Sequence, residues 1–524
     1  MSSSSTNVAR SHSWRGALAA VCAACLCGCV VGPDYRAPAP TAARGFAPEP
    51  LPALTASTPV PGGEAQRFVT GQDIRADWWA LFESPALDAL VERALRANPT
   101  LEAAQAALRI AQENVEAQRG LFFPTVQAGY SPSRTKIAGN QGGNSPGLQG
   151  DGSVISTGAG TPASQGGSAP FNAPVIYNFH TAQLTVGYVP DVFGGNRRQV
   201  ESLEAQADYQ RLQLEAAQIT LASNVVAAAI QEALLRAQIA TAQRIVEGNL
   251  QSVALLRRQQ EAGHASRLDL ALQETALSQA RQSLPPLQKQ FEQTRNLLRA
   301  LVGGMQDVEL PATFELASLR LPRELPLSLP SRVVAQRPDV RAAEAQLHAA
   351  SAQVGVAVAN RLPQFSLDAT WGGAASHIGQ MFWSSGRFFN LAGNVTQTLF
   401  DGGALRHRQA AAEEGLRQAG AQYQSTVITA FQNVADTLRA IHADADALAL
   451  AVELERHAGV SLALVRRQLS GGYVDRLALL TAEQVHDQAV LSLAQAQAAR
   501  LGDTAALFQA LGGGWWAREA TASN

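Results

Sequence analysis

Residues 390–403 read Asn-Leu-Ala-Gly-Asn-Val-Thr-Gln-Thr-Leu-Phe-Asp-Gly-Gly, and this stretch decides the fold. Leu391, Val395 and Leu399 lie an even number of residues apart among polar neighbours, which indicates a strand with one apolar face. Two glycines then end the pattern, and residues 404–470 contain no proline. A helix over that run would span roughly 100 Å. The stretch therefore predicts a strand that leads directly into a very long helix.

The chain contains this arrangement twice. Residues 99–124 match residues 338–363 at an offset of 239 residues, and residues 224–304 match residues 433–513 at an offset of 209. The first half has its own proline-free run at residues 196–262. Solenoid repeats have periods of about 20–50 residues. The much longer period here indicates duplication of a domain-sized unit.

Three more segments alternate with the period of a strand, at residues 125–130, 181–188 and 364–371. The four segments form two predicted hairpins. Residues 131–175, within the first hairpin, are rich in Gly, Ser, Asn and Pro and are predicted to be a long extracellular loop. Half-apolar strands also occur in soluble sheets packed on one side, so the pattern alone leaves that alternative open.

Further helices are predicted from their periodicity of 3.6 residues, with Pro124 and Pro363 ending two of them. They cover residues 85–119, 267–301, 331–360 and 476–510. Gly263 and Gly472 separate the long runs from their return helices. Pro285 and Pro286 predict a kink in the first return helix.

The N-terminus has the pattern of an export signal, with a basic start followed by a short apolar run at residues 17–26. Leu26-Cys27-Gly28-Cys29 then resembles the bacterial lipoprotein cleavage box, which predicts a covalent lipid on Cys29 and no other cofactor. Ordinary signal cleavage without a lipid is the alternative. All four cysteines lie in this segment, so no disulfide framework is expected.

Composition excludes several classes of function. The chain has 41 Lys and Arg against 43 Asp and Glu and no basic stripe, which disfavours nucleic acid as a partner. No run after the signal approaches 18 uncharged apolar residues, so no membrane-spanning helix is expected. HExxH and GxxxxGK motifs are absent and the nine histidines are scattered, so we predict neither an enzyme nor a metal site.

Four amphipathic strands are too few to close a membrane barrel within one chain. Because unpaired backbone groups are not tolerated in lipid, the barrel must be shared between copies. Two copies would give eight strands and a filled interior, whereas three would give twelve and room for water. The sequence therefore predicts a homotrimer with polar strand faces toward the lumen and apolar faces toward outer-membrane lipid.

The predicted fold is an α+β membrane protein, in which a trimeric 12-stranded antiparallel β-barrel is continued by an α-helical barrel of coiled-coil hairpins. Its segments are a signal peptide (1–28), an acylated arm (29–72), a first repeat (73–304), a linker (305–330), a second repeat (331–514) and a tail (515–524).

An ordered set of short segments resembles the TolC/OprM-type outer-membrane channels of tripartite efflux pumps, including their NodT-like branch. The segments are Cys29-Val-Val-Gly-Pro-Asp-Tyr35, Trp78-Trp-Ala-Leu-Phe82, Asn98-Pro99, Arg337-Pro-Asp339, Phe400-Asp-Gly-Gly403 and Ala510-Leu-Gly-Gly-Gly-Trp515. The resemblance covers nearly the whole chain after the signal.

The resemblance implies a passive exit duct for small molecules such as drugs, located in the outer membrane of a Gram-negative bacterium and extending through the periplasm. Its implied partners are a periplasmic adaptor protein and a proton-driven inner-membrane transporter. The helix-hairpin tips are implied to contact the adaptor through Gly263, Ser266, Arg267, Leu268, Gly472, Asp475, Arg476 and Leu477.

Family members often close the periplasmic aperture with a Leu and, four residues later, an Asp. Leu477 matches the first position, but Thr481 stands at the second, so Asp475 or Asp269 is the alternative source of charge. Two other functions remain open at this point: an exit duct for polypeptide (type I) secretion, and a periplasmic coiled-coil lipoprotein scaffold without a channel.

Overall fold

The computed structural model describes residues 30–39, 45–46, 52–137, 175–304, 310 and 314–515. Cys29, the predicted signal peptide and most of the predicted tail lie outside these residues. The chain divides into two compact units, each assembled from both halves of the sequence. Unit 1 comprises Met1–Arg36, Ala111–Ala205 and His348–Gln418, and unit 2 comprises Ala37–Ile110, Gln206–Leu347 and Ala419–Asn524.

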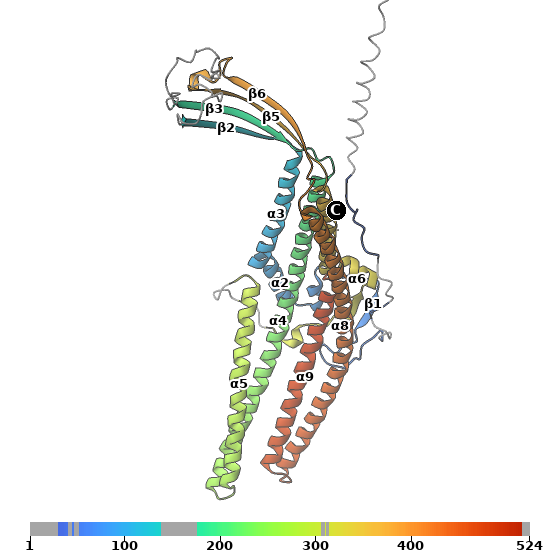
Figure 1. The fold of residues 1–524 in the computed structure, drawn as a ribbon. Coiled ribbons are helices and arrows are strands. Elements are labelled where there is room, and N and C mark those ends of the chain that lie inside the picture. Colours follow the sequence, from blue (N-terminus) through green and yellow to red (C-terminus); the bar gives the residue numbers. More distant parts are fainter. Residues whose placement is uncertain are drawn as a thin grey trace, which may run out of the picture. The chain divides into compact units, whose positions relative to one another are not determined.

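Unit 1 contains a four-stranded antiparallel sheet in the order β2-β3-β5-β6 (Figure 1). The strands are β2 (Thr125–Ile137), β3 (Val175–Tyr188), β5 (Gln364–Ala375) and β6 (Arg387–Thr396). The four predicted strands are confirmed, but β2 and β3 extend into the predicted loop at residues 131–175. The rest of that loop is outside the described residues. β6 ends before Leu399, which was predicted to belong to it.

In two neighbouring rows, the pairing register aligns apolar residues with apolar ones and polar residues with polar ones across all four strands. Successive partners in one row are all apolar: Val126, Val186, Ala369 and Leu391. The adjacent row is all polar: Gln127, Thr185, Thr370 and Asn390. Because neighbouring residues of a strand point to opposite sides, the sheet has an apolar face and a polar face. The apolar face is solvent-accessible in the isolated chain, with Phe389 82% and Leu391 78% exposed.

Two long helical hairpins follow the strand pairs. They consist of α4 (Gly195–Glu261) with α5 (Arg267–Leu301), and α8 (Ala404–Ser470) with α9 (Arg476–Ala510). Their bounds confirm the predicted runs to within one residue. Asp191 caps α4 by accepting the Asn196 and Arg197 backbone N–H groups at 3.0 and 2.9 Å. α5 stays helical through Pro285 and Pro286, where the kink is predicted.

The shorter predicted helices are each broken once, contrary to the prediction. Residues 85–119 form α2 (Pro85–Ala97) and α3 (Pro99–Arg119), and residues 331–360 form α6 (Pro330–Gln336) and α7 (Pro338–Ala359). The breaks fall at Asn98 and Arg337, whose ψ angles of 121° and 125° are extended. The following proline disfavours helical geometry at the preceding residue, which explains both breaks.

Part of the predicted arm (29–72) is paired with part of the predicted linker (305–330). β1 (Arg67–Thr70) and β4 (Glu324–Leu327) form a two-stranded parallel sheet in unit 2. Next to β1, the fully buried Gln66 side chain donates to the Pro322 carbonyl at 3.1 Å and to the Thr504 hydroxyl at 3.2 Å. Residues 66–70 therefore belong to the packed body of unit 2.

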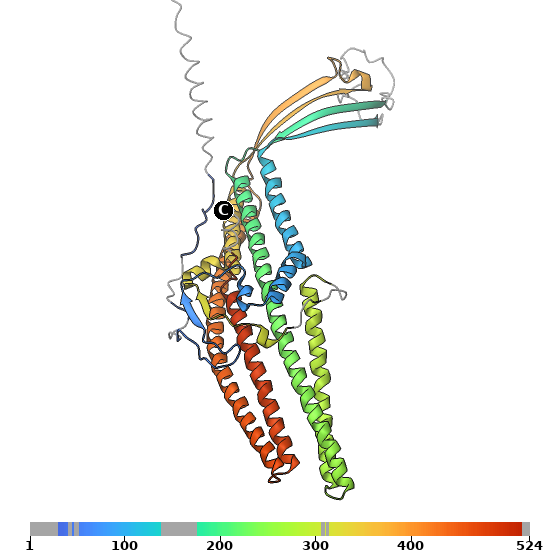
Figure 2. The same cartoon turned by 180° about the vertical axis from the view of Figure 1, so that it is seen from behind.

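The core of unit 2 forms around the Trp78–Phe82 3₁₀ turn (η1). Trp78 is buried and stacks on Phe508 of α9 with ring centroids 5.3 Å apart. α4 supplies buried Val225 and Ala229 to the same core. One window of α4 has the length and hydropathy, 1.2, of a membrane span, but 61% of it is buried within the protein. Its apolar character is therefore used in packing. Figure 2 shows the reverse side of the helices.

Unit 2 also buries charge beside this core. The Arg500 side chain has no exposed surface and donates to the Thr55 hydroxyl at 3.0 Å and to the Glu64 carbonyl at 2.6 Å. Burial raises the pKa of Asp444 to about 7; a hydrogen bond with Asp503 and its charge act in the same direction, and the charge of Arg500 acts against them. The protonated form of Asp444 is therefore favoured by folding.

This shift predicts how stability depends on pH. Folded Asp444 binds a proton more tightly than an unfolded Asp, which titrates near about 3.9, so the free energy of unfolding falls as pH rises from about 4 to about 7. Asp444→Asn removes this loss of unfolding free energy. The variant should therefore melt a few degrees above the parent chain at pH 8 and at nearly the same temperature at pH 4. Calorimetry on the purified protein measures both, with the exposed Asp436→Asn as control. Equal melting of Asp444→Asn and the parent chain at pH 8 would contradict the assignment.

Candidate functional site: sheet faces, hairpin tips and an N-terminal clasp

The polar face of the sheet carries a short hydrogen-bonded network. The Asp368 carboxylate accepts from the Asn394 side chain at 3.2 Å and from the Ser366 hydroxyl at 3.3 Å. Among the described strand residues on this face, Asp368 is the only charged group. The face is therefore suited to contact with water and polar solutes.

The two outer strands of the sheet are open on one side. β2 pairs only with β3 and β6 only with β5 within the described part of the chain. Each outer strand therefore presents a row of backbone N–H and C=O groups with the capacity to pair with another strand. Combined with the exposed apolar face, these edges form a surface that a single copy leaves incomplete.

Each hairpin tip is built by the same sequence of caps. Gly263 and Gly472 have φ angles of +78° and +75°, in the left-handed region that favours glycine. The His264 N–H donates to the Gln259 carbonyl at 2.8 Å, and the Tyr473 N–H donates to the Gln468 carbonyl at 2.9 Å. These are Schellman motifs, which satisfy the last carbonyl groups of α4 and α8.

The return helices α5 and α9 begin at side-chain caps, which lie two residues after His264 and Tyr473. The Ser266 hydroxyl accepts from the Asp269 N–H at 3.1 Å, and Asp475 accepts from the Ala478 N–H at 2.8 Å. Hydrogen bonds from the Ser266 side chain and backbone hold the pKa of Asp269 below its usual range. Asp269 is the N3 residue of a capping box at the start of α5, and Asp475 is the N-cap of α9, so both side chains fix the geometry of the turns.

Matched ion pairs hold each hairpin together above its tip. Arg257 lies 2.8 Å from Glu274 in the first hairpin, and Arg466 lies 3.3 Å from Glu483 in the second. The four residues occupy equivalent positions at the offset of 209. All four side chains are partly exposed, so each pair contributes roughly 0–1 kcal/mol. Their main effect is to fix the register of the paired helices.

The two tips share a cavity of about 770 Å³. The structure brings together four residues of the sequence-predicted sites, Asp475, Arg476, Leu477 and Thr481, with Asp269 from the other hairpin. Gly263, Ser266, Arg267, Leu268 and Gly472 do not line this cavity. Leu268 and Leu477 are 67% and 65% exposed and are available for contact with other molecules.

The predicted aperture position Thr481 is not a source of charge. Its hydroxyl donates to the Leu477 carbonyl at 3.0 Å, one turn earlier in α9. Leu477 and Asp475 both lie at the end of the hairpin, but only Asp475 carries an acidic group. If an anionic ring exists at this level, Asp475 and Asp269 are the residues in the shared cavity with the necessary charge.

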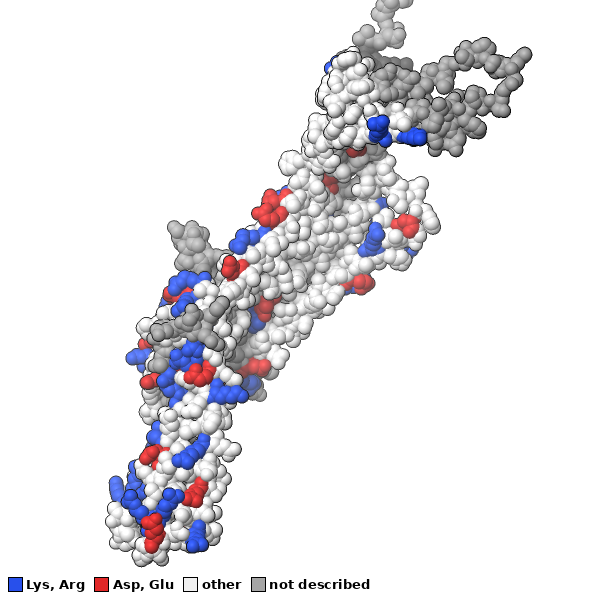
Figure 3. All heavy atoms as spheres, turned by 90° about the vertical axis from the view of Figure 1, so that its left-hand side faces the viewer, with Lys and Arg blue, Asp and Glu red and all other residues white. Residues whose placement is uncertain are grey.

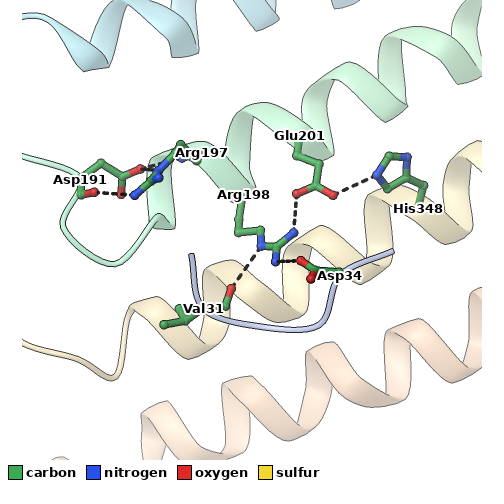
Figure 4. A network of polar contacts seen from close by, with 7 residues as sticks. All are labelled: Val31, Asp34, Asp191, Arg197, Arg198, Glu201 and His348. Atoms are coloured by element: carbon green, nitrogen blue, oxygen red, sulfur yellow. Dashed lines mark hydrogen bonds and ion pairs between the residues drawn. The ribbon is translucent and has the colours of Figure 1, made fainter. Parts of the chain in front are cut away.

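A second site in unit 1, here called the clasp, holds residues 31–35 (Figure 4). The Arg198 side chain on α4 is 5% exposed and donates to the Val31 carbonyl at 3.1 Å and to Asp34 at 2.7 Å. Its third contact is Glu201 at 2.7 Å, and Glu201 in turn bonds His348 of α7 at 3.0 Å. One guanidinium thus joins the N-terminal segment to α4 and, through Glu201, to α7.

Close backbone packing completes the clasp. Tyr35 stacks on His348 with ring centroids 4.2 Å apart. Gly32 has a φ of +96°, and a side chain there would place its Cβ 2.4 Å from Cα of Gly355. The Val31 N–H also donates to the Phe193 carbonyl at 3.2 Å. Residues 31–35 are therefore seated at the junction between β3 and α4, directly after the predicted lipidation position.

Sequence reasoning did not identify Arg198 or His348. In the sequence alone, the segment that they hold is marked only by its resemblance to a family motif. Its Gly-Pro-Asp-Tyr order, next to Cys29, was the available signal that these residues are docked. Asp34 and Arg198 are 164 residues apart in the sequence, and hydrophobic periodicity does not predict contacts over such a separation.

Arg198→Gln tests the clasp. The change removes the cation from a buried position with three partners and should lower the free energy of unfolding by about 2–4 kcal/mol. Hydrogen exchange of the Val31 amide should become at least about tenfold faster, as measured by mass spectrometry of the purified protein. Asp34→Asn is the matched control, because the Asp34 side chain is 89% exposed and should cost about 1 kcal/mol or less. Unchanged exchange in Arg198→Gln would show that the segment is held in another way.

Comparison with known proteins identifies the family. The model of the outer membrane efflux protein family matches residues 90–304 and 329–513. The pyoverdine export outer membrane protein OpmQ of Pseudomonas putida is 31% identical over 446 residues, covering 85% of this chain and 89% of that protein. The toluene efflux pump outer membrane protein TtgI of Pseudomonas putida is 29% identical over 504 residues, covering 93% and 96%.

A solved structure matches most of the chain. The outer-membrane channel OprN matches with a TM-score of 0.75 and 26% identity, covering 93% of this chain and 100% of that chain. The chain belongs to the outer membrane efflux protein family, and its location is the outer membrane.

Proposed function

We propose that three copies of this chain form a passive exit duct for small molecules across the outer membrane and the periplasm. The single observation that carries the proposal is the four-stranded sheet with two open edges and an exposed apolar face. In hydrocarbon, open edges leave backbone polar groups unpaired at a cost of several kcal/mol each. Pairing of β2 with β6 of the next copy removes both edges.

The number of strands favours three copies. Four strands from each of three chains give a twelve-stranded barrel, which is wide enough for a water-filled lumen. In this arrangement the polar face with Asp368 and Asn394 faces the lumen, and the apolar face with Phe389 and Leu391 faces lipid. The strands have 10–14 residues, which suits tilted membrane strands of about 9–11 residues with short extensions.

The helical hairpins supply the proposed periplasmic part of the duct. Their exposed tips, with Leu268 and Leu477, are the proposed contacts for an adaptor protein, which connects to an inner-membrane, proton-driven transporter. The cargo is proposed to be small organic molecules, because relatives are described as exporters of pyoverdine and toluene. The clasp holds the segment after Cys29 and supports a lipid anchor at the same end of α4 as the sheet.

Cross-linking tests the shared barrel. Within one chain β2 and β6 are separated by two strands, or roughly 14 Å, which a bismaleimide of about 8 Å does not span. Gln127→Cys combined in turn with Asn390→Cys and Asn394→Cys should give covalent trimers on denaturing gels. The chain has no native cysteine beyond Cys29, so the background is low. Gln127→Cys alone is the control. The trimers should also conduct in planar lipid films, and a silent, uncross-linked monomer would favour the scaffold alternative.

Single-channel recording tests the aperture. Leu477→Ala should raise conductance at least about twofold, because it removes an apolar side chain that lines the cavity shared by the two tips, which Leu268 does not line. Asp475→Asn keeps an N-cap and removes only the charge, so it should reduce cation preference without loosening the turn. Leu268→Ala, with equal exposure at the equivalent position of the other hairpin, is the control. If all three variants conduct like the parent channel, the constriction lies elsewhere.

A further inference from the structure

The apolar face of the sheet ends in three cationic side chains, here called the cation row: Arg134, Lys136 and Arg387. All three are exposed. Among the described strand residues no acidic side chain lies on this face, since Asp368 points to the opposite one. In Figure 3 blue side chains lie at the end of the sheet that borders the grey atoms.

Arg134 and Arg387 lie equally far from the helix-proximal ends of their own strands, although the pairing register aligns Arg387 with Tyr130, four residues before Arg134. Arg134 is the tenth residue of β2 counted from Thr125, next to the helices, and Arg387 is the tenth residue of β6 counted from Thr396. Nine steps of about 3.3 Å span roughly 30 Å along a strand, or roughly 23 Å of height at a tilt of about 40°. The outward apolar band of a membrane barrel is about 25 Å tall. The cation row therefore begins where the apolar band ends.

Large aromatic side chains lie immediately below. Trp371 pairs with Phe389, and the next row on the same face pairs Gly373 with Arg387. Trp371 is 55% and Phe389 82% exposed, and Phe382 and Trp383 of the connecting turn are 60% and 59% exposed. Aromatic rings gather at the boundary between hydrocarbon and headgroups. Two independent features, charge and aromatic content, thus mark the same boundary.

We infer that the cation row binds phosphorylated lipid headgroups of the outer leaflet. The inference rests on the proposed barrel, which turns this face toward lipid. Guanidinium groups bind phosphate oxygens in pairs, and an ammonium adds a third cation. With no carboxylate on the described part of this face to neutralise them, the three cations are complementary to an anionic surface. Each trimer would present three such rows around its circumference.

Binding of a defined lipid tests the inference on the full-length protein. Purified trimer in neutral detergent is titrated with bisphosphorylated lipid A, and the same lipid with both phosphates removed is the second probe. Native mass spectrometry counts retained lipid. The parent protein should retain the bisphosphorylated form at least about tenfold better, and added salt should reduce the difference because it screens exposed charges. Equal retention of both lipids would overturn the inference without any variant.

A triple variant then locates the site. Arg134→Gln, Lys136→Gln and Arg387→Gln together should abolish the preference for the phosphorylated lipid. Arg258→Gln, Arg281→Gln and Lys289→Gln, three exposed cations on the helices, form the matched control and should keep it. The assignment would be overturned if both triple variants lost the preference for phosphorylated lipid, or if the cation-row variant kept it. Conductance is measured in parallel, so failure of the barrel is distinguished from failure of lipid binding. Single Arg387→Lys and Arg134→Lys variants should keep the preference.

Discussion

Unpaired backbone groups along the edges of β2 and β6 are the constraint on which the rest of the structure depends. A sheet of four strands is stable in water only if its apolar face is covered, and stable in lipid only if its edges are paired. In the proposed trimer, identical neighbours would satisfy the second requirement with the strands already present. The register that aligns Val126 with Leu391 across the sheet makes this possible, because every strand turns its apolar side the same way.

The helices meet a different requirement, since they must remain regular over many turns. α4 and α8 each contain 67 residues, and both end in a glycine with positive φ followed by a side-chain cap. Their apolar residues are used within unit 2, where Val225 packs near Trp78 and Phe508. The tips are therefore rigid turns with exposed leucines, a geometry suited to contact with another protein.

Much of this arrangement could be predicted from periodicity and proline positions. The bounds of α8, at residues 404–470, follow from the absence of proline and from the flanking glycines. The breaks at Asn98 and Arg337 were missed because helical periodicity continues across them, although each residue precedes a proline. The ends of β2 and β3 were missed because Ser131–Ser133 and the residues opposite lack apolar alternation.

The sites also differ in whether the sequence alone could locate them. The hairpin tips could be located because glycine and capping residues are local signals. The clasp could not, because Arg198 carries no local sign of its partners Val31 and Asp34. The cation row could not be assigned to one face until the register placed Arg134 and Arg387 on the same side as Trp371.

The clasp also imposes an order of events on biogenesis. Tyr35 leaves the translocation machinery early, whereas its stacking partner His348 follows 313 residues later. Contacts of the segment with Phe193 and Arg198 can form earlier, but the stacking of Tyr35 has to wait until His348 has followed. If Cys29 is lipidated as predicted, the modifying enzymes would meet this segment before Tyr35 stacks on His348.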